Sequence, residues 1–180
     1  MALTATVYTF DVQLSHVDRG VYETLSVRAA RHPSETEEYL LTRLLAYCLE
    51  YREGIGFTRG LAEPDEPAVE VRDLTGGRTA WIEVGSPDAA RLHRASKASP
   101  RVAIYTHRDP AQLLRQLDGQ KIHRAEHVEL WAVDRELLAA LSERLERRMA
   151  IDVAVTDGQL YVTTGGETLE GEVTRHALPS

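Results

Sequence analysis

The sequence has a single cysteine, Cys48, among its 180 residues. A disulfide within the chain needs two cysteines and a zinc site built from several thiolates needs more, so both are excluded. This scarcity of thiols suits a reducing compartment, and we expect a cytoplasmic protein. Cys48 falls on an apolar stripe at helical spacing, which is typical of a small core residue and not of a nucleophile.

Long apolar runs and aromatic residues are also scarce. No window approaches the roughly 20 uninterrupted apolar residues that cross a bilayer, and the N-terminus lacks the pattern of a signal peptide. We therefore expect neither membrane spanning nor secretion. Aromatic residues make up 6% of the chain, too few for an extended platform on which single-stranded bases stack. The glycine pairs at 76–77 and 165–166 lie in expected turns and do not match a phosphate-binding loop.

An excess of basic charge is missing as well. The 21 Lys and Arg residues are outnumbered by 28 Asp and Glu residues, and the net charge is −7. This charge opposes the sequence-independent attraction to phosphate on which basic nucleic-acid-binding proteins depend. Any nucleic-acid partner must therefore be bound through a local basic patch.

The residues that are present are typical of a folded domain. Hydrophobic residues at 43% and charged residues at 27% lie near the globular average. With no repeat or linker, a single domain is expected over residues 1–180. Alternation over 4–13 and 22–30 predicts an antiparallel hairpin. Ser34 and Glu37 then form a capping box, which predicts a helix that begins at Ser34.

The rest of the chain predicts a mixture of strands and helices. A glycine turn joins two strands into a second hairpin, and helices then alternate with strands until a terminal β-meander. The expected fold class is α/β (α+β), a mixed β-sheet with flanking helices. The expected elements are strands 68–73 and 78–84, helix 86–98 capped by Ser86, strand 102–105, helix 109–117, strand 128–133, helix 135–147, and strands 151–155, 160–163 and 168–174.

Two acidic positions have the spacing of a metal-dependent nuclease. Pro64 and Asp65 are followed, after seventeen residues, by Glu83, Val84 and Gly85. Carboxylates from adjacent strands can hold Mg²⁺ beside a phosphodiester, because Mg²⁺ prefers oxygen ligands. A lysine normally follows such a glutamate by two residues, and here Gly85 takes its place.

Glu83 interrupts an apolar run that otherwise looks buried, so it needs a partner or a metal. The alternative to a metal site is a strand-end carboxylate paired with an arginine, with Asp65 and Glu66 in a solvated turn. Glu37 lies on the core-facing stripe of its helix and is a candidate third metal ligand. Its alternative role is the glutamate of the capping box.

The helix after Glu83 carries the local basic patch. Arg91, Arg94 and Lys97, with Arg101, place four permanent positive charges in eleven residues without an acid. We expect Arg94 to take over the charge-stabilising role of the missing lysine, and Arg91 and Lys97 to bind substrate phosphates. Arginine stays protonated, so Arg94 could clamp phosphate but not activate water. The alternative is a solvated helix face.

Two histidines offer a further alternative. His123 and His127 are four residues apart with Glu126 between them, a spacing found in transition-metal sites. No third ligand accompanies them in the sequence, so they also fit ordinary surface residues.

Four segments in order closely resemble the bacterial YaeQ family, and the likeness extends from the first residues to the last. These segments are 30–36 (ARHPSET), 57–61 (FTRGL), 65–67 (DEP) and 81–88 (WIEVGSPD). The resemblance implies a fold similar to the PD-(D/E)xK nuclease superfamily. It also implies a variant site, in which the usual lysine is absent and a basic residue of the following helix replaces it. Arg94 occupies that position, where relatives are expected to have lysine. Arg59, in the second segment, is implied to line the same pocket.

Two functions follow from these residues and this resemblance. The first is a Mg²⁺-dependent nuclease or phosphodiesterase with Asp65 and Glu83 as metal ligands, Glu37 as the third ligand and Arg94 as the phosphate clamp. The second is a binding or regulatory protein that keeps the nuclease-like fold without turnover, because fold does not determine function. For the second, the resemblance implies a link to transcription elongation.

Overall fold

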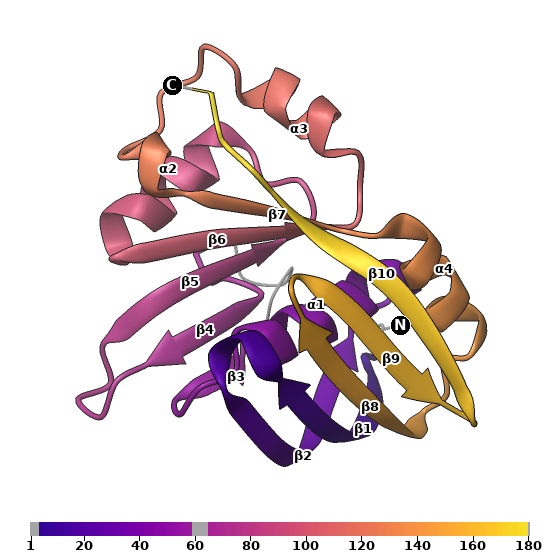
Figure 1. The fold of residues 1–180 in the computed structure, drawn as a ribbon. Helices are drawn as coiled ribbons and strands as arrows, with labels where there is room; N and C mark the ends of the chain where they lie inside the picture. The colour runs from indigo at the N-terminus through magenta and orange to yellow at the C-terminus, as the bar shows by residue number, and fades with distance from the viewer. Residues whose placement is uncertain (1–3, 59–64, 180) are drawn as a thin grey trace. The chain divides into compact units, whose positions relative to one another are not determined.

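The computed structural model describes residues 4–58 and 65–179 (Figure 1). It divides into two compact units, the first made of Met1–Tyr51 and Val133–Val173, the second of Arg52–Ala132 and Thr174–Ser180. Each unit combines two separate stretches of chain, so no linker in the sequence marks a boundary between them. The single domain expected over residues 1–180 remains a prediction.

The first unit is built on a sheet in the order β2-β1-β8-β9-β10. The N-terminal hairpin is confirmed, and the C-terminal meander extends its sheet because β8 pairs in parallel with β1. Alternating residues of β1 are buried, from Tyr8 to Leu14, as expected for a strand with one face on a core. The strands are β1 (Thr6–His16), β2 (Val21–Arg31), β8 (Arg148–Thr156), β9 (Gln159–Thr164) and β10 (Glu167–His176).

Two helices of this unit begin or end away from the predicted residues. Helix α1 spans Glu37–Leu49 and is capped by Thr36, whose hydroxyl accepts the Tyr39 N–H at 3.0 Å. The predicted capping box from Ser34 to Glu37, with a helix that begins at Ser34, is therefore wrong. Ser34 is hydrogen-bonded to the His32 ring instead. Helix α4 spans Arg135–Glu143 and ends before the expected residue 147. Strand β8 then begins at Arg148, earlier than the expected residue 151.

The second unit is built on a sheet in the order β7-β6-β5-β4-β3, with β5, β6 and β7 parallel. The hairpin of β4 and β5 is confirmed. Strand β3 is not among the strands predicted from the sequence. Gly54 adopts φ +92, and a Cβ there would collide with the Arg72 carbonyl. The strands are β3 (Ile55–Phe57), β4 (Val69–Arg72), β5 (Arg78–Val84), β6 (Arg101–Thr106) and β7 (Glu129–Val133).

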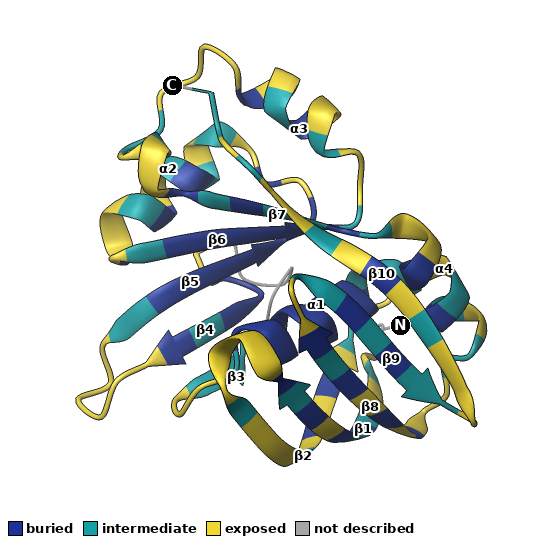
Figure 2. Ribbon diagram, in the orientation of Figure 1, coloured by how far each residue is buried: buried dark blue, intermediate teal, exposed yellow. Residues whose placement is uncertain are grey.

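Helices α2 (Ala89–Ala98) and α3 (Pro110–Leu117) supply the core of the second unit. Leu92 of α2 and Leu113 of α3 belong to one apolar cluster with Ile104 of β6. Figure 2 shows β5 and β6 as nearly continuous buried runs, which is typical of central parallel strands. The observed architecture confirms the mixed α+β fold class. None of the described helices is long and apolar enough to cross a bilayer.

Candidate functional site

Glu83 lies near the end of β5 and is the buried carboxylate of the second unit, with an exposed fraction of 4%. Its two oxygens have different partners. The Trp81 indole N–H donates to Oε1, and Nε of Arg91 donates to Oε2 at 2.8 Å. Trp81 is two residues before Glu83, so both side chains lie on the same face of the strand. Of the two expected environments for Glu83, the structure has the pairing with an arginine.

Arg91 also joins β5 to the segment that carries Asp65. Its guanidinium donates to the backbone carbonyl of Glu66 at 2.5 Å while Nε stays on Glu83. Asp65 itself is exposed. In this structure Arg91 thus bridges the two expected acidic segments, and its role in binding substrate remains a prediction.

The residue across the sheet from Glu83 is not an acid. Strands β4 and β5 pair with Val69 opposite Ile82, and continuing this register by one residue sets Ala68 opposite Glu83. Ala68 is buried. Opposed residues of an antiparallel pair have close Cβ atoms, so the position best placed to share a cation with Glu83 carries only a methyl group.

No set of metal ligands is assembled around Glu83 among the described residues. Both oxygens of Glu83 are engaged, and no group of three or more His, Cys, Asp or Glu side chains in the described part of the chain is arranged to hold a metal. Glu37 belongs to the first unit and is half-buried at the start of α1, whereas Asp65 and Glu83 belong to the second. The magnesium site of Asp65, Glu83 and Glu37 remains a prediction.

Helix α2 begins later than predicted. The four cations of the expected basic patch fall into two that are paired with carboxylates and two that are exposed. Asp88, not Ser86, caps it by accepting the Arg91 N–H at 2.8 Å. Arg91 pairs with Glu83, and Arg101 pairs with Glu129 at 2.9 Å. Arg94 and Lys97 are exposed, and within residues 4–58 and 65–179 no carboxylate lies within ion-pair distance of either. Half of the expected patch is thus neutralised.

The segment after α3 adds positive charge that the sequence analysis did not assign. The backbone N–H of His123 donates to Nδ1 of His93 at 2.9 Å, which ties this segment to α2. Partial burial and the nearby charges of Lys97, Lys121 and His123 lower the pKa of His93. We call Arg94, Lys97 and Lys121 the basic surface. The run 121–124 is visibly basic in sequence, but only the fold brings it to α2.

The spacing that suggested a transition-metal site at His123 and His127 assumed a shared helix, and the structure does not have one there. His127 ends the short 3-10 helix η3 (Ala125–His127), so His123 and His127 do not share an α-helical face. His127 faces Glu126 at 3.7 Å and is largely exposed. The ring of His123 instead meets that of His93 edge-on. Arg59, the remaining predicted site residue, lies outside the described residues.

Two buried groups of the first unit are structural. Glu35 and Arg43 form an ion pair at 3.1 Å that the sequence analysis missed, and Arg43 also donates to the Ala30 carbonyl. Burial raises the pKa of Glu35 despite the attraction of Arg43. Cys48 is fully buried and burial raises its pKa to about 12, which confirms a core residue and not a nucleophile.

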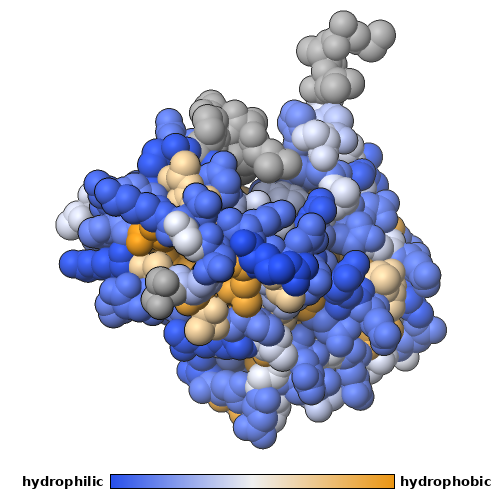
Figure 3. Space-filling model, turned by 90° about the horizontal axis from the view of Figure 1, so that it is seen from above, coloured by the Kyte–Doolittle hydropathy of each residue, from blue (hydrophilic) through white to orange (hydrophobic). Residues whose placement is uncertain are grey.

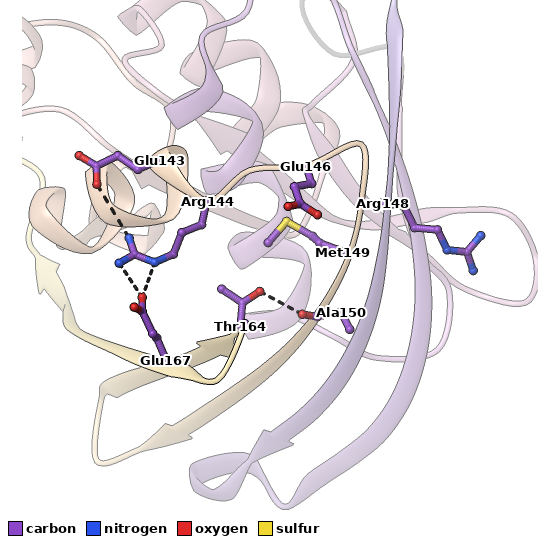
Figure 4. A pocket seen from close by; sticks show the side chains of 9 residues that line it. Glu143, Arg144, Glu146, Arg148, Met149, Ala150, Thr164 and Glu167 are labelled. Carbon is purple, nitrogen blue, oxygen red and sulfur yellow. Dashed lines mark hydrogen bonds and ion pairs between the residues drawn. The ribbon is translucent and has the colours of Figure 1, made fainter.

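A cavity of about 750 Å³ also belongs to the first unit. Figure 4 shows Arg144 at its edge, held between Glu167 at 2.6 Å and Glu143 at 3.9 Å. Thr164 donates to the Ala150 carbonyl nearby. None of the predicted site residues lines this cavity, and its acidic and basic groups largely neutralise one another, so it indicates no ligand of one charge.

Comparison with known proteins places the chain in a family. The family model described as YaeQ protein matches residues 1–173. The "Uncharacterized protein YaeQ" of Escherichia coli (strain K12) is 35% identical, and that of Salmonella typhi is 34% identical, each over 100% of both chains. The chain therefore belongs to the YaeQ family, and the expected resemblance is confirmed.

Solved structures agree with this assignment. The crystal structure of YaeQ protein from Pseudomonas syringae has a TM-score of 0.85 and 34% identity, and the match covers 95% of each chain. The structure from Xanthomonas axonopodis pv. citri has a TM-score of 0.86 and 30% identity, covering 98% of this chain and 100% of the other. The fold described above is thus similar to that of the family over nearly its whole length.

Proposed function

We propose that this chain is a nucleic-acid-binding protein that has a PD-(D/E)xK nuclease-like core but does not hydrolyse phosphodiesters. The observation that carries the proposal is the engagement of both Glu83 oxygens, one by Trp81 and the other by Arg91. The basic surface is its contact with the phosphate backbone. A regulatory role on nucleic acid, including the link to transcription elongation, is consistent with binding alone.

Arg91 is the cation that contacts the Glu83 carboxylate. Metal-assisted hydrolysis requires carboxylate oxygens that are open to the ion, and a hydroxide or a base to supply the nucleophile. A guanidinium compensates the charge of Glu83 but stays protonated at neutral pH, so it generates no base. The neighbouring Ala68 offers no second carboxylate. Binding without turnover is the function that this arrangement supports best.

The basic surface suits a few contacts to phosphate. Arg94 and Lys97 are three residues apart on α2, so they lie on the same side of the helix, away from buried Leu92 and Ala95. The face seen in Figure 3 is mostly hydrophilic, and its apolar residues form small separate groups. Three cations give a salt dependence of log affinity on log salt of roughly −2.7 for duplex DNA. The net charge of −7 limits attraction at longer range.

Fluorescence anisotropy with labelled single- and double-stranded DNA and RNA tests this binding. The double substitution Arg94→Gln and Lys97→Gln removes two of the three cations and is expected to weaken binding by about tenfold or more while lowering the salt slope by about two. Arg115→Gln is the matched control, since Arg115 is an exposed arginine on α3 of the same unit. Equal losses in the control and the double variant would contradict the proposal.

Magnesium and manganese titrations decide whether turnover is absent. We expect neither metal to raise the thermal unfolding midpoint of the protein, and neither to support cleavage of the same nucleic acids. Cleavage that disappears in both Asp65→Ala and Glu83→Gln would overturn the non-catalytic proposal in favour of the magnesium-dependent nuclease. Cleavage that survives both substitutions would come from a contaminating enzyme.

A further inference from the structure

A second cavity, of about 330 Å³, opens in the second unit beside α2. Three of its lining residues are basic, three are apolar and one is a serine, and no acidic residue lines it in the described part of the chain. The lining residues are Ser96, Pro100, Arg101, Val102, Arg124, His127 and Val128. A cationic lining stands out in a chain of net charge −7 and favours an anionic ligand.

Arg101 is held in place at this cavity. Its Nε and one terminal N–H donate to the two oxygens of Glu129, at 2.9 and 3.3 Å. Glu129 in turn accepts the Trp131 indole N–H. The pair neutralises much of the Arg101 charge but restricts the guanidinium, so the net positive charge of the cavity comes mainly from Arg124.

Arg124 has an unusual backbone. It adopts φ 49 and ψ 46, the left-handed conformation, at the residue before η3. A side chain with a Cβ disfavours this conformation, which glycine adopts freely. The Arg124 carbonyl accepts the His127 N–H at 2.9 Å, which closes the turn. Strained residues of this kind concentrate at binding sites, and here the strained residue is the main cation of the cavity lining.

The size and lining of the cavity limit the ligand. Its apolar residues, Pro100, Val102 and Val128, can contact a base or sugar, while arginine binds phosphate through its fork of N–H groups. A volume of about 330 Å³ is at the lower end for small-molecule sites. It holds a single nucleotide and not a length of strand. Ser96 of the lining directly precedes Lys97 of the basic surface on α2.

We propose that this cavity binds a nucleoside carrying a phosphomonoester, with Arg124 as the principal phosphate ligand and Arg101 and His127 beside it. A phosphomonoester carries about −1.5 to −2 charges at neutral pH, more than a backbone diester, so one arginine discriminates between them. The ligand is either the phosphorylated end of a strand or a free mononucleotide. The first of these rests on the proposed function; the second does not.

The test compares oligonucleotides of one sequence that differ only at their ends. Fluorescence anisotropy is measured with 5′-phosphate, 3′-phosphate and hydroxyl-ended strands, and calorimetry is measured with AMP. One hydrogen-bonded charge pair gives an expected preference for a phosphorylated end of about tenfold. Arg124→Asn removes the guanidinium but keeps a residue that tolerates a positive φ. It should abolish the preference and leave the affinity of the hydroxyl-ended strand unchanged.

Arg115→Gln is again the control, and the thermal unfolding midpoint of each variant shows that it is folded. Preference lost in Arg124→Asn and kept in the control supports the inference. AMP binding that depends on Arg124, without strand binding, supports the cavity and refutes the proposed function. Strand binding through the basic surface with no preference for phosphate, and no AMP binding, refutes the inference alone. Equal competition by a glutamate-rich peptide would also overturn it, because the site would then select charge and not phosphate.

Discussion

Each of the two units contains a buried glutamate paired with an arginine, and the pairs differ in their access to solvent. In the first unit, the side chains of Glu35 and Arg43 are 2% and 3% exposed. In the second, the Glu83 side chain is 6% exposed, whereas that of Arg91 is 21% exposed. Only the second pair has a partner at the surface. The first pair joins the chain before α1 to α1 itself, and the second joins β5 to α2 through a partly exposed arginine.

The comparison also shows why a buried carboxylate is not in itself a functional site. A buried ion pair loses much of its attraction to the cost of removing two charges from water. At Glu35 this cost is large enough to raise the pKa of the carboxyl even beside Arg43. Arg43 also donates to the Ala30 carbonyl, so the pair ties α1 to the end of β2. Such a pair specifies local structure, and its removal should be felt mainly as instability.

The largest predicted effect is therefore in the first unit. Arg43→Ala leaves Glu35 buried without its partner, and we expect the free energy of unfolding to fall by about 3–5 kcal/mol. Urea unfolding followed by circular dichroism measures the loss. The double variant Glu35→Met and Arg43→Met removes both charges at similar volume and should recover most of it. A double variant as unstable as Arg43→Ala would show that shape, and not charge, is what matters there.

The second unit should tolerate the equivalent change better. Arg91→Ala leaves Glu83 with the Trp81 indole as a remaining donor, and we expect a loss of about 1–3 kcal/mol, smaller than for Arg43→Ala. Arg91→Lys should restore only part of it, because an ammonium lacks the planar fork that reaches both the Glu83 carboxylate and the Glu66 carbonyl. The same urea experiment applies. A larger loss for Arg91→Ala than for Arg43→Ala would reverse the comparison.

The sequence predicted the kind of environment of Glu83 but not its partner. A carboxylate inside the run from Trp81 to Val84 had to be paired or bound to metal, and the run itself was read correctly as a buried strand. The choice of Arg91 depended on where α2 begins. Asp88 caps that helix, which sets Arg91 in the first turn facing back to β5. A shift of the helix start by two residues changes which side chain faces the sheet.

Other features depend on contacts between distant segments. The sequence pattern does not indicate the Glu35–Arg43 pair, because a capping box from Ser34 to Glu37 would place Glu35 in the first turn of the helix. Helical periodicity does not show that the chain before α1 turns inward. Two of the three residues of the basic surface were predicted, because Arg94 and Lys97 lie on one helix, whereas Lys121 joins them only through the fold. Local patterns specify elements well, but which loops meet is determined by tertiary packing.

The smallest predicted effect is on the pH dependence of stability, and it arises at His93 in the second unit. Partial burial and the charges of Lys97, Lys121 and His123 lower its pKa below 6.5. Its Nδ1 accepts the His123 N–H only while that nitrogen is unprotonated. The unfolded chain therefore binds the proton more readily than the folded one. The stability contributed by neutral His93 is complete above pH 6.5 and is lost as the pH falls through the lower folded-state pKa.

His93→Asn keeps an acceptor but removes the titration, so its free energy of unfolding should change less than that of the unmodified protein when the pH falls from above to below 6.5. His127→Asn, at a largely exposed histidine of the same unit, is the matched control substitution. Urea unfolding at the two pH values measures both. If His93→Asn retains the full pH dependence, the hydrogen bond to His123 does not link α2 to the segment that carries Lys121. The basic surface would then be two independent patches, and each lysine should contribute to binding without the other.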